Sequence, residues 1–250
     1  MSIEEYLFRI GVEKVKPPSL EFLAELQNTH LLNIPFEDLD IPYRDKIILD
    51  LERIYNKIIP SKRGGFCYEL NGLFHWLLTQ LGFKVDMLSA QVFNHDRHDL
   101  GPEFDHMTLL VHLEKDYLTD VGFGDSFRMP IEFPRGDQRD ISGHYRIVTV
   151  GDNEFDLRRK ENYEWILQYK FSITPRIFSD YGKMCEYQQT FPESIFRNRM
   201  LCTIATPTGR IMLSDSSLTI TDSGTKTKTE LKNEEEFFYL LKKYFRIELN

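Results

Sequence analysis

RGGFCYELNGLFHWLLTQL, residues 63 to 81, is the stretch around which we expect the chain to fold. Two adjacent glycines break the chain at its start. Apolar residues then recur at three- and four-residue intervals, the spacing of one face of an α-helix. Gly82 follows as a C-terminal stop signal. The stretch therefore predicts an amphipathic helix, whose apolar face carries Leu70, Leu73, Phe74, Leu77, Leu78 and Leu81.

Cys67 lies where the Gly-Gly turn meets this helix, in the first predicted helical turn. The N–H groups at a helix N-terminus are unpaired and carry about half a positive charge. This favours the thiolate and predicts a thiol pKa below the usual value of about 8.5. A lone cysteine is also common as an inert core residue, so position alone leaves both interpretations open. Cys185 and Cys202 have no comparable context, and we interpret both as packing residues.

The composition is that of an ordinary globular protein, with 41% hydrophobic and 28% charged residues. The net charge of 31 − 39 = −8 disfavours nucleic-acid binding. Three cysteines do not make a disulfide framework, which favours a reducing compartment. No apolar run approaches the roughly 18 residues that span a membrane, and the acidic first residues lack a signal-peptide core. We therefore expect a cytoplasmic protein without a membrane contact; nothing in the sequence indicates an oligomeric state.

The hydrophobic pattern changes along the chain and predicts an α+β protein in three parts. The first part is helical, with Ser19 and Asp50 as N-caps and a proline-containing extended loop at residues 33–45. Residues 84–171 are rich in short β-type segments, including a hairpin around residues 151–153, and predict an antiparallel sheet or barrel. A connecting helix is expected at residues 179–190. Short strands follow, and then a last helix whose capping box is Asn233 with Glu236.

A thiolate nucleophile needs a base and a group that orients the base. His106 opens the apolar strand HMTLLV directly after a polar loop, which places an imidazole at the rim of the predicted sheet. His112 lies on the same face of that strand and is the competing choice. Asp120, in YLTDVGFG on the next strand, is the candidate orienting acid. His95 and His98 have no evident third ligand beside them, so we predict no metal site.

A simple hairpin does not bring this acid to the base. A turn centred on Glu114 or Lys115 would place Asp120 opposite Leu109 or Leu110. His106 would then lie three or four residues away, roughly 10–13 Å along the strand. A bulge, a kink or strong barrel shear would have to close that gap. Spacing alone therefore leaves the triad undecided.

Several motifs taken together resemble the arylamine N-acetyltransferase family. They are RGGFCYELN, the histidine that opens HMTLLV, and DVGFG; the upstream YLFRIG and H-x-x-x-IPFEDL are similar to the family's N-terminal motifs. The resemblance spans most of residues 1–130 in consistent order and spacing. RGGFC before an amphipathic helix is its specific part. One departure is Asp38 in PFEDL, where the family more often has Asn.

The resemblance implies a fold of three domains with a cysteine-protease-like core. These are a helical bundle over residues 1–83, an antiparallel β-barrel with a connecting helix over 84–190, and a small α/β lid over 191–250. It also implies a catalytic triad of Cys67, His106 and Asp120. The implied enzyme belongs to xenobiotic metabolism and runs a ping-pong reaction without a metal. Acetyl-CoA acetylates the cysteine, which passes the acetyl group to a small aromatic amine or hydrazine.

Four further residues complete the expected site. Phe36 and Phe123 lie in family-like motifs and are expected to face the acceptor ring, although aromatic core is an equally good interpretation. Arg63 is expected to pair with Glu37 as structural support, which would pin the extended loop beside the nucleophile. The backbone N–H of Cys67 is the expected oxyanion donor.

Two other function classes are compatible with these residues. A thiol hydrolase or transglutaminase-like enzyme uses the same triad logic, although the thiol-protease motif C-G-S-C-W is absent. A catalytically silent binding protein could keep the fold, although all three triad residue types are present here.

Overall fold

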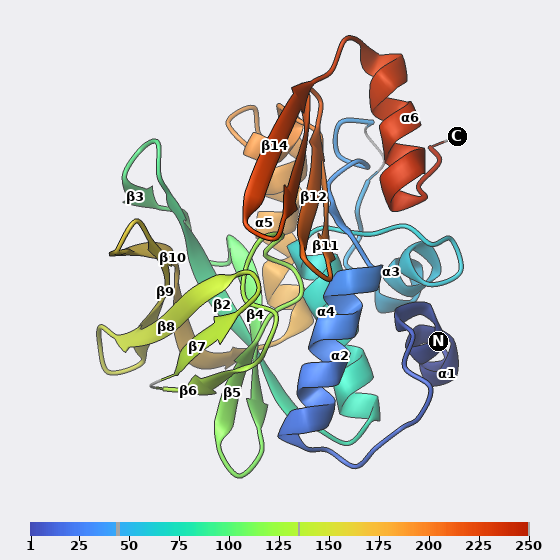
Figure 1. Ribbon diagram of the computed structural model, residues 1–250. Helices are drawn as coiled ribbons and strands as arrows, with labels where there is room; N and C mark the ends of the chain where they lie inside the picture. The colour runs from blue at the N-terminus through green and yellow to red at the C-terminus, as the bar shows by residue number, and fades with distance from the viewer. Residues whose placement is uncertain (44–45, 135, 250) are drawn as a thin grey trace.

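The computed structural model describes residues 1–43, 46–134 and 136–249. Within these ranges the chain forms a group of N-terminal helices, a large curved sheet and a smaller sheet with a C-terminal helix (Figure 1). The helices are α1 (Ile3–Ile10), α2 (Leu20–Asn33), α3 (Leu51–Ile58), α4 (Cys67–Gln80), α5 (Gly182–Thr190) and α6 (Glu234–Phe245), with short 3-10 helices η1 (Phe178–Tyr181) and η2 (Ile195–Arg197).

Helices α2 and α3 begin at the N-caps that the sequence predicts. Ser19 accepts a hydrogen bond from the N–H of Phe22 at 3.2 Å, and Asp50 accepts one from the N–H of Arg53 at 2.9 Å. The predicted loop at residues 33–45 is non-helical after α2. It contains the two-residue strand β1 (Phe36–Glu37), and its last residues, 44 and 45, lie outside the described residues.

Helix α4 runs through the interior of the protein rather than along its surface (Figure 1). The predicted apolar face is buried, but Glu69 and Asn71 on the other side are also buried, at 2% and 0% exposure. The reason is that the large sheet packs against α4 opposite the other helices. A buried polar group costs free energy unless it is hydrogen-bonded, and both side chains have partners. Replacing Leu77, which is fully buried, with alanine should cost about 2–5 kcal/mol.

The large sheet is antiparallel and curls into a nearly closed barrel. Its strands are β2 (Lys84–Asn94), β3 (Asp99–Leu100), β4 (His106–His112), β5 (Asp116–Thr119), β6 (Ile131–Phe133), β7 (Asp137–Asp140), β8 (Gly143–Thr149), β9 (Glu154–Glu161) and β10 (Glu164–Arg176). The order is β6-β5-β4-β2-β10-β9-β8-β7, with β3 paired to β2. The edge strands β6 and β7 follow one another in the chain, so the two edges lie close together. The predicted barrel and the predicted β8–β9 hairpin are thus confirmed.

Strand β4 joins the two main cores because successive side chains point to opposite faces. Met107, Leu109 and Val111 pack in the core shared with α4, whereas Leu110 packs inside the barrel. This double burial explains why the strand is a nearly continuous apolar run. It also fixes the direction in which His106, the first residue of the strand, can point.

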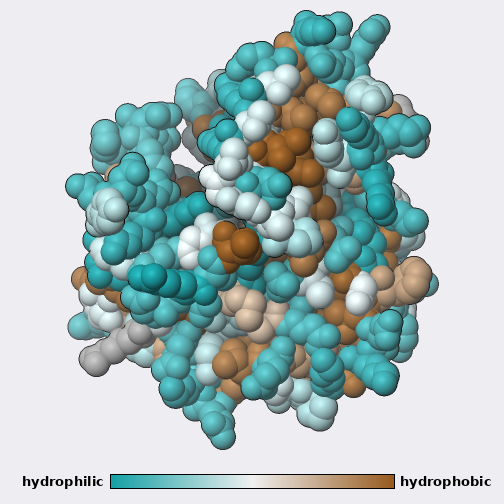
Figure 2. Space-filling view, in the orientation of Figure 1, coloured by the Kyte–Doolittle hydropathy of each residue, from teal (hydrophilic) through white to brown (hydrophobic). Residues whose placement is uncertain are grey.

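The smaller sheet has the order β1-β11-β12-β13-β14 and is covered by α6. Its C-terminal strands are β11 (Leu201–Thr206), β12 (Gly209–Ser214), β13 (Ser217–Asp222) and β14 (Thr225–Glu230). In Figure 2, hydrophobic surface gathers over this sheet beside α6, while most of the remaining face is hydrophilic. The cap of α6 differs from the expected capping box. Asn233 accepts from the N–H of Glu236 at 2.9 Å, but the Glu236 carboxylate accepts from the N–H of Lys232 instead of Asn233.

Segments from different parts of the chain connect the helical core, the core inside the barrel and the core between the smaller sheet and α6. Strand β1 pairs with β11, and α5 with η1 packs on the helical core through Tyr181 and Cys185. The domain boundaries at residues 83 and 190 stay predictions. Within the described ranges, no helix combines the length and apolar character needed to cross a membrane.

Candidate active site

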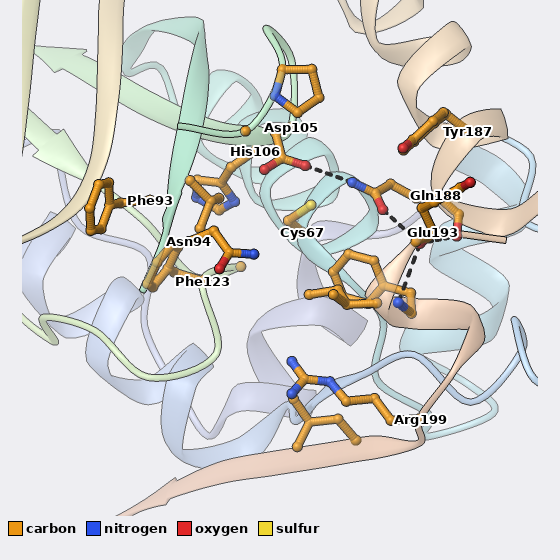
Figure 3. Close-up of a pocket in the computed structure, with 18 of the residues that line it drawn as sticks. Cys67, Phe93, Asn94, Asp105, His106, Phe123, Tyr187, Gln188, Glu193 and Arg199 are labelled. Atoms are coloured by element: carbon orange, nitrogen blue, oxygen red, sulfur yellow. Dashed lines mark hydrogen bonds between the residues drawn. The ribbon is translucent and has the colours of Figure 1, made fainter. Parts of the chain in front are cut away.

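A cavity of about 290 Å³ opens where the helices, the barrel and the α5 segment meet. Its wall includes Cys67 from α4, His106 from β4, Phe123 from the loop after β5 and Gln188 from α5. Figure 3 shows the Cys67 sulfur lying in this space between His106 and Gln188. A thiol and an imidazole that share one cavity are the first two parts of a nucleophilic site.

Cys67 is the first residue of α4, as the sequence predicts. The turn before it needs glycine, because a Cβ at Gly64 would lie 2.1 Å from the carbonyl oxygen of Pro35. The helix start is fixed by Glu69, whose carboxylate accepts a hydrogen bond from the N–H of Phe66 at 3.1 Å. Lys57 donates to the same carboxylate at 2.9 Å, so this buried acid is paired. The sulfur is therefore held by local backbone geometry.

The thiol pKa differs from the sequence-based expectation. Burial raises the pKa of the Cys67 thiol well above its usual value, and the charges of Asp105 and Asp120 raise it further. A hydrogen bond from the backbone N–H of Met107 acts in the opposite direction. The lowered pKa predicted from the helix N-terminus is wrong, because the cysteine is only 4% exposed and desolvation of the anion outweighs the helix charge. Burial therefore disfavours the thiolate, and a neighbouring base would favour it.

His106 and Asp120 are hydrogen-bonded in the interior. The Nε2 of His106 lies 2.6 Å from Oδ2 of Asp120, and both side chains are at most 3% exposed. This contact leaves Nδ1 as the ring nitrogen available to another group. The competing candidate, His112, binds Asp86 and Asp116 at 3.0 and 2.7 Å and does not line the cavity.

The register of the β4–β5 hairpin explains this contact and corrects our expectation. Leu109 pairs with Thr119 and Leu110 with Leu118, so Asp120 lies level with Thr108 rather than with Leu109 or Leu110. His106 is two residues further along the same face, a diagonal offset of about 7 Å that the two side chains span. The register between these strands is continuous, so no bulge is needed.

Three further donors hold the Asp120 carboxylate. Oδ1 accepts from the Nδ2 of Asn71 and from the N–H of Gly122, both at 2.9 Å. Oδ2 accepts from the hydroxyl of Tyr169 at 3.2 Å. Burial raises the pKa of Asp120, but the charge on His106 and the hydrogen bonds outweigh burial and lower it below its usual value. Asp120 is therefore a carboxylate that can stabilise a positive charge on His106.

Asn71 and Tyr169 are site residues that the sequence analysis missed. Asn71 lies four residues after Cys67, on the same face of α4, and that spacing could have indicated it. Its amide also donates to the carbonyl of Met107 at 2.6 Å and accepts from the N–H of Val121 at 2.9 Å. Tyr169 lies on β10, and no local motif marks it.

Phe36 and Phe123 both line the cavity. The Phe123 ring meets the His106 ring edge-on at 5.2 Å and also contacts Tyr169 at 5.2 Å. Phe36 is 8% exposed. The loop of Phe123 passes close to the nucleophile, since a Cβ at Gly122 would lie 2.9 Å from the Cα of Cys67. Both aromatic rings can therefore contact a molecule beside the sulfur.

The predicted ion pair between Arg63 and Glu37 is present. Nε and Nη2 of Arg63 donate to the two Glu37 oxygens at 2.8 and 3.1 Å, and Nη2 also donates to Asp40 at 2.6 Å. The N–H of Glu37 donates to the carbonyl of Gly65 at 2.9 Å. These bonds tie the loop carrying Phe36 to the turn before Cys67.

The remaining histidines and cysteines lie outside this cavity. His30, His75 and His144 contact Tyr6, the Val85 carbonyl and Asp137 respectively. Cys185 and Cys202 are buried, and burial raises the pKa of each thiol. In the part of the chain that the structure describes, no group of three or more His, Cys, Asp or Glu side chains could hold a metal ion.

Comparisons with known proteins find similar sequences over the full length of the chain. The family model described as N-acetyltransferase matches residues 19–250. The chain is 33% identical to arylamine N-acetyltransferase 2 of Mus musculus, over 100% of this chain and 95% of that protein.

Solved structures are also similar. The arylamine N-acetyltransferase of Mycobacterium marinum in complex with CoA is 28% identical, with a TM-score of 0.91 over 98% of this chain and 93% of that one. A Bacillus cereus arylamine N-acetyltransferase, described as having a unique Cys-His-Glu catalytic triad, is 26% identical, with a TM-score of 0.91 over 98% of each chain.

Proposed function

The chain belongs to the arylamine N-acetyltransferase family, and from this membership we propose that Cys67, His106 and Asp120 transfer an acetyl group from acetyl-CoA to an arylamine or arylhydrazine. As a member of the family, it is an acyltransferase that acetylates arylamines with acetyl-CoA. The observation that carries the residue assignment is the 2.6 Å contact between His106 and Asp120 in the cavity that also holds Cys67.

In the first half of the proposed reaction, Nδ1 of His106 takes the proton of the Cys67 thiol. The sulfur attacks the acetyl carbon, a new carbon–sulfur bond forms, and the bond to the CoA sulfur breaks. The imidazolium then returns the proton to the leaving CoA thiolate. Asp120 stabilises the positive ring and keeps the Nε2 proton on the side away from the cysteine. Because burial disfavours the thiolate, a base beside the sulfur assists this step.

In the second half, the acceptor nitrogen attacks the acetyl group on Cys67. The carbon–sulfur bond breaks, the nitrogen proton passes through His106, and the thiol is restored. Each step is an acyl or proton transfer between named groups, so the proposed route needs no metal. The backbone N–H of Cys67, at the start of α4, is a suitable donor to the developing oxyanion. Phe36 and Phe123 are proposed to contact the acceptor ring.

The cavity wall also carries two exposed cations suited to CoA. Arg97 and Arg199 line the cavity, and Figure 3 shows Arg199 on the side opposite Asp105. Guanidinium groups bind phosphate oxygens well, so we propose that these arginines receive the CoA phosphates.

The three free cysteines fit a reducing compartment, and on that ground we propose a cytoplasmic location. The net charge of −8 gives no support to a nucleic-acid partner.

Mass spectrometry after incubation with acetyl-CoA and no acceptor tests the proposal. A single acetyl group should appear on the peptide containing Cys67, with one equivalent of free CoA. The Cys185→Ala variant should acetylate like the wild type, and Cys67→Ala should not acetylate. Acetylation of a different residue, or acetyl transfer only when both substrates are present, would contradict the acetyl-cysteine route.

A further inference from the structure

A second carboxylate, Asp105, lies in the wall of the cavity without belonging to the triad. It precedes His106 in the chain and lines the same cavity as Cys67. Figure 3 shows its carboxylate facing Gln188, on the same side of the cavity as the Cys67 sulfur. The proposed mechanism assigns no step to this group.

The chain holds this carboxylate in a defined position. The Nε2 of Gln188 donates to Oδ1 of Asp105 at 2.6 Å. The side-chain oxygen Oε1 of Gln188 in turn accepts from the Ser194 hydroxyl at 2.8 Å. On the other side, a Cβ at Gly101 would lie 2.3 Å from Oδ2 of Asp105, so the absence of a side chain there leaves room for the carboxylate. The hydrogen bond from Gln188 thus orients the carboxylate, and the bare Gly101 leaves it room in the cavity wall.

The Asp105 charge acts directly on the reacting atoms. Burial is the main cause that raises the pKa of the Cys67 thiol. The charge of Asp105 is the second, ahead of that of Asp120. Burial raises the pKa of Asp105 itself, while His106, Gln188 and a backbone N–H act to keep it ionised. The electrostatic field of the Asp105 carboxylate therefore extends to the sulfur. An acceptor must be placed there to attack the acetyl group.

Other charged groups on the cavity wall are more strongly screened. Arg97 is 60% exposed and pairs with Asp99, and Arg199 and Glu193 are exposed. Water and salt weaken exposed charges much more than partly buried ones. Asp105 is half-buried, so its charge is less screened than those of the exposed Arg97, Arg199 and Glu193.

We propose that Asp105 is a specificity-determining residue, whose carboxylate disfavours acceptors that carry a negative charge and favours those that carry a positive one. The inference rests on the proposed acetyl transfer through Cys67 and names the acceptor class of that site. For unit charges about 8 Å apart at an effective dielectric constant of about 20, with partial salt screening, the discrimination is roughly 10-fold.

The test uses three anilines of similar shape whose para side chains carry different charges. They are 4-aminophenylacetate, 4-propylaniline and 4-aminobenzyl trimethylammonium; the methylene group separates the charge from the amine. The rate at which each acceptor removes acetyl from acetylated enzyme is measured for wild type, Asp105→Asn and Glu193→Gln. Glu193 is the matched control, because it lines the same cavity but is exposed.

Wild type should use the neutral acceptor about 10-fold faster than the anionic one and should prefer the cationic one. Asp105→Asn should bring the three rates to within about 2-fold of one another, and Glu193→Gln should keep the wild-type ratios. Equal rates or a preference for the anion in wild type would overturn the inference, even if Asp105→Asn does not fold. Unchanged ratios in folded Asp105→Asn would overturn it as well. If Cys67 is never acetylated, the proposed function itself fails, and the two failures are distinct.

Discussion

Replacing Asp120 with asparagine tests how the site controls the protonation of His106. In the wild type, Oδ1 of Asp120 accepts from Asn71 and Gly122, while Oδ2 faces Nε2 of His106. An asparagine must keep its oxygen toward the two donors, so its NH2 group would face Nε2. The imidazole would then carry its proton on Nδ1, the nitrogen that should accept the proton of Cys67.

The expected loss of rate follows from these contacts. A hydrogen bond to a charged group contributes about 1.5–3 kcal/mol, so losing it slows acetylation by roughly 10- to 100-fold. The wrong tautomer adds to this loss, and the same exchange in a serine triad lowers turnover by about 10⁴. We expect Asp120→Asn to slow CoA release from acetyl-CoA by about 10³- to 10⁴-fold. Rapid-mixing measurement of the CoA burst, with circular dichroism to check folding, gives this value.

Asp116→Asn is the matched control, since Asp116 lies on the same strand and binds His112 outside the cavity. It should release CoA at the wild-type rate. A folded Asp120→Asn protein that releases CoA within 10-fold of the wild-type rate would refute the proposed role of Asp120.

Residues outside the triad also affect the rate and the stability of the protein. Tyr169→Phe removes one donor to Asp120 and should slow the CoA burst by about 10-fold without unfolding the protein. Arg63→Ala leaves the fully buried Glu37 unpaired and should lower the free energy of unfolding in urea by about 3–5 kcal/mol. Burial raises the pKa of Asp38 to about 7, so the folded state holds this proton more tightly than the unfolded state, and stability falls as pH rises from about 4 to about 7. Asp38→Asn should remove that fall, so its melting temperature should exceed that of the wild type more at pH 8 than at pH 4.5.

Exposed residues of the same types are the controls. Tyr163→Phe, at a residue 94% exposed, should keep the wild-type burst. Arg97→Ala removes a surface ion pair and should change stability by less than about 1 kcal/mol. Asp152→Asn should not change how the melting temperature depends on pH. If a control variant changes the measured rate or stability as much as its test variant does, the named contact is not the cause.

Features that depend on neighbouring residues could be predicted from the amino-acid sequence. The caps at Ser19 and Asp50 are hydrogen bonds over three positions, and the position of Cys67 at a helix start follows from the turn at Gly64. The β8–β9 hairpin is set by a short turn in the same way. Motif resemblance then indicated the family and singled out His106.

Features that depend on contacts between distant residues could not be predicted in this way. The observed register of the β4–β5 hairpin differs by one or two residues from the predicted one, because packing on two cores selects the pairing of these strands. Tyr169 reaches Asp120 from β10, and no spacing rule relates the two residues. The pKa of Cys67 is raised rather than lowered, since desolvation depends on everything packed around α4, whereas the helix charge depends only on the local backbone.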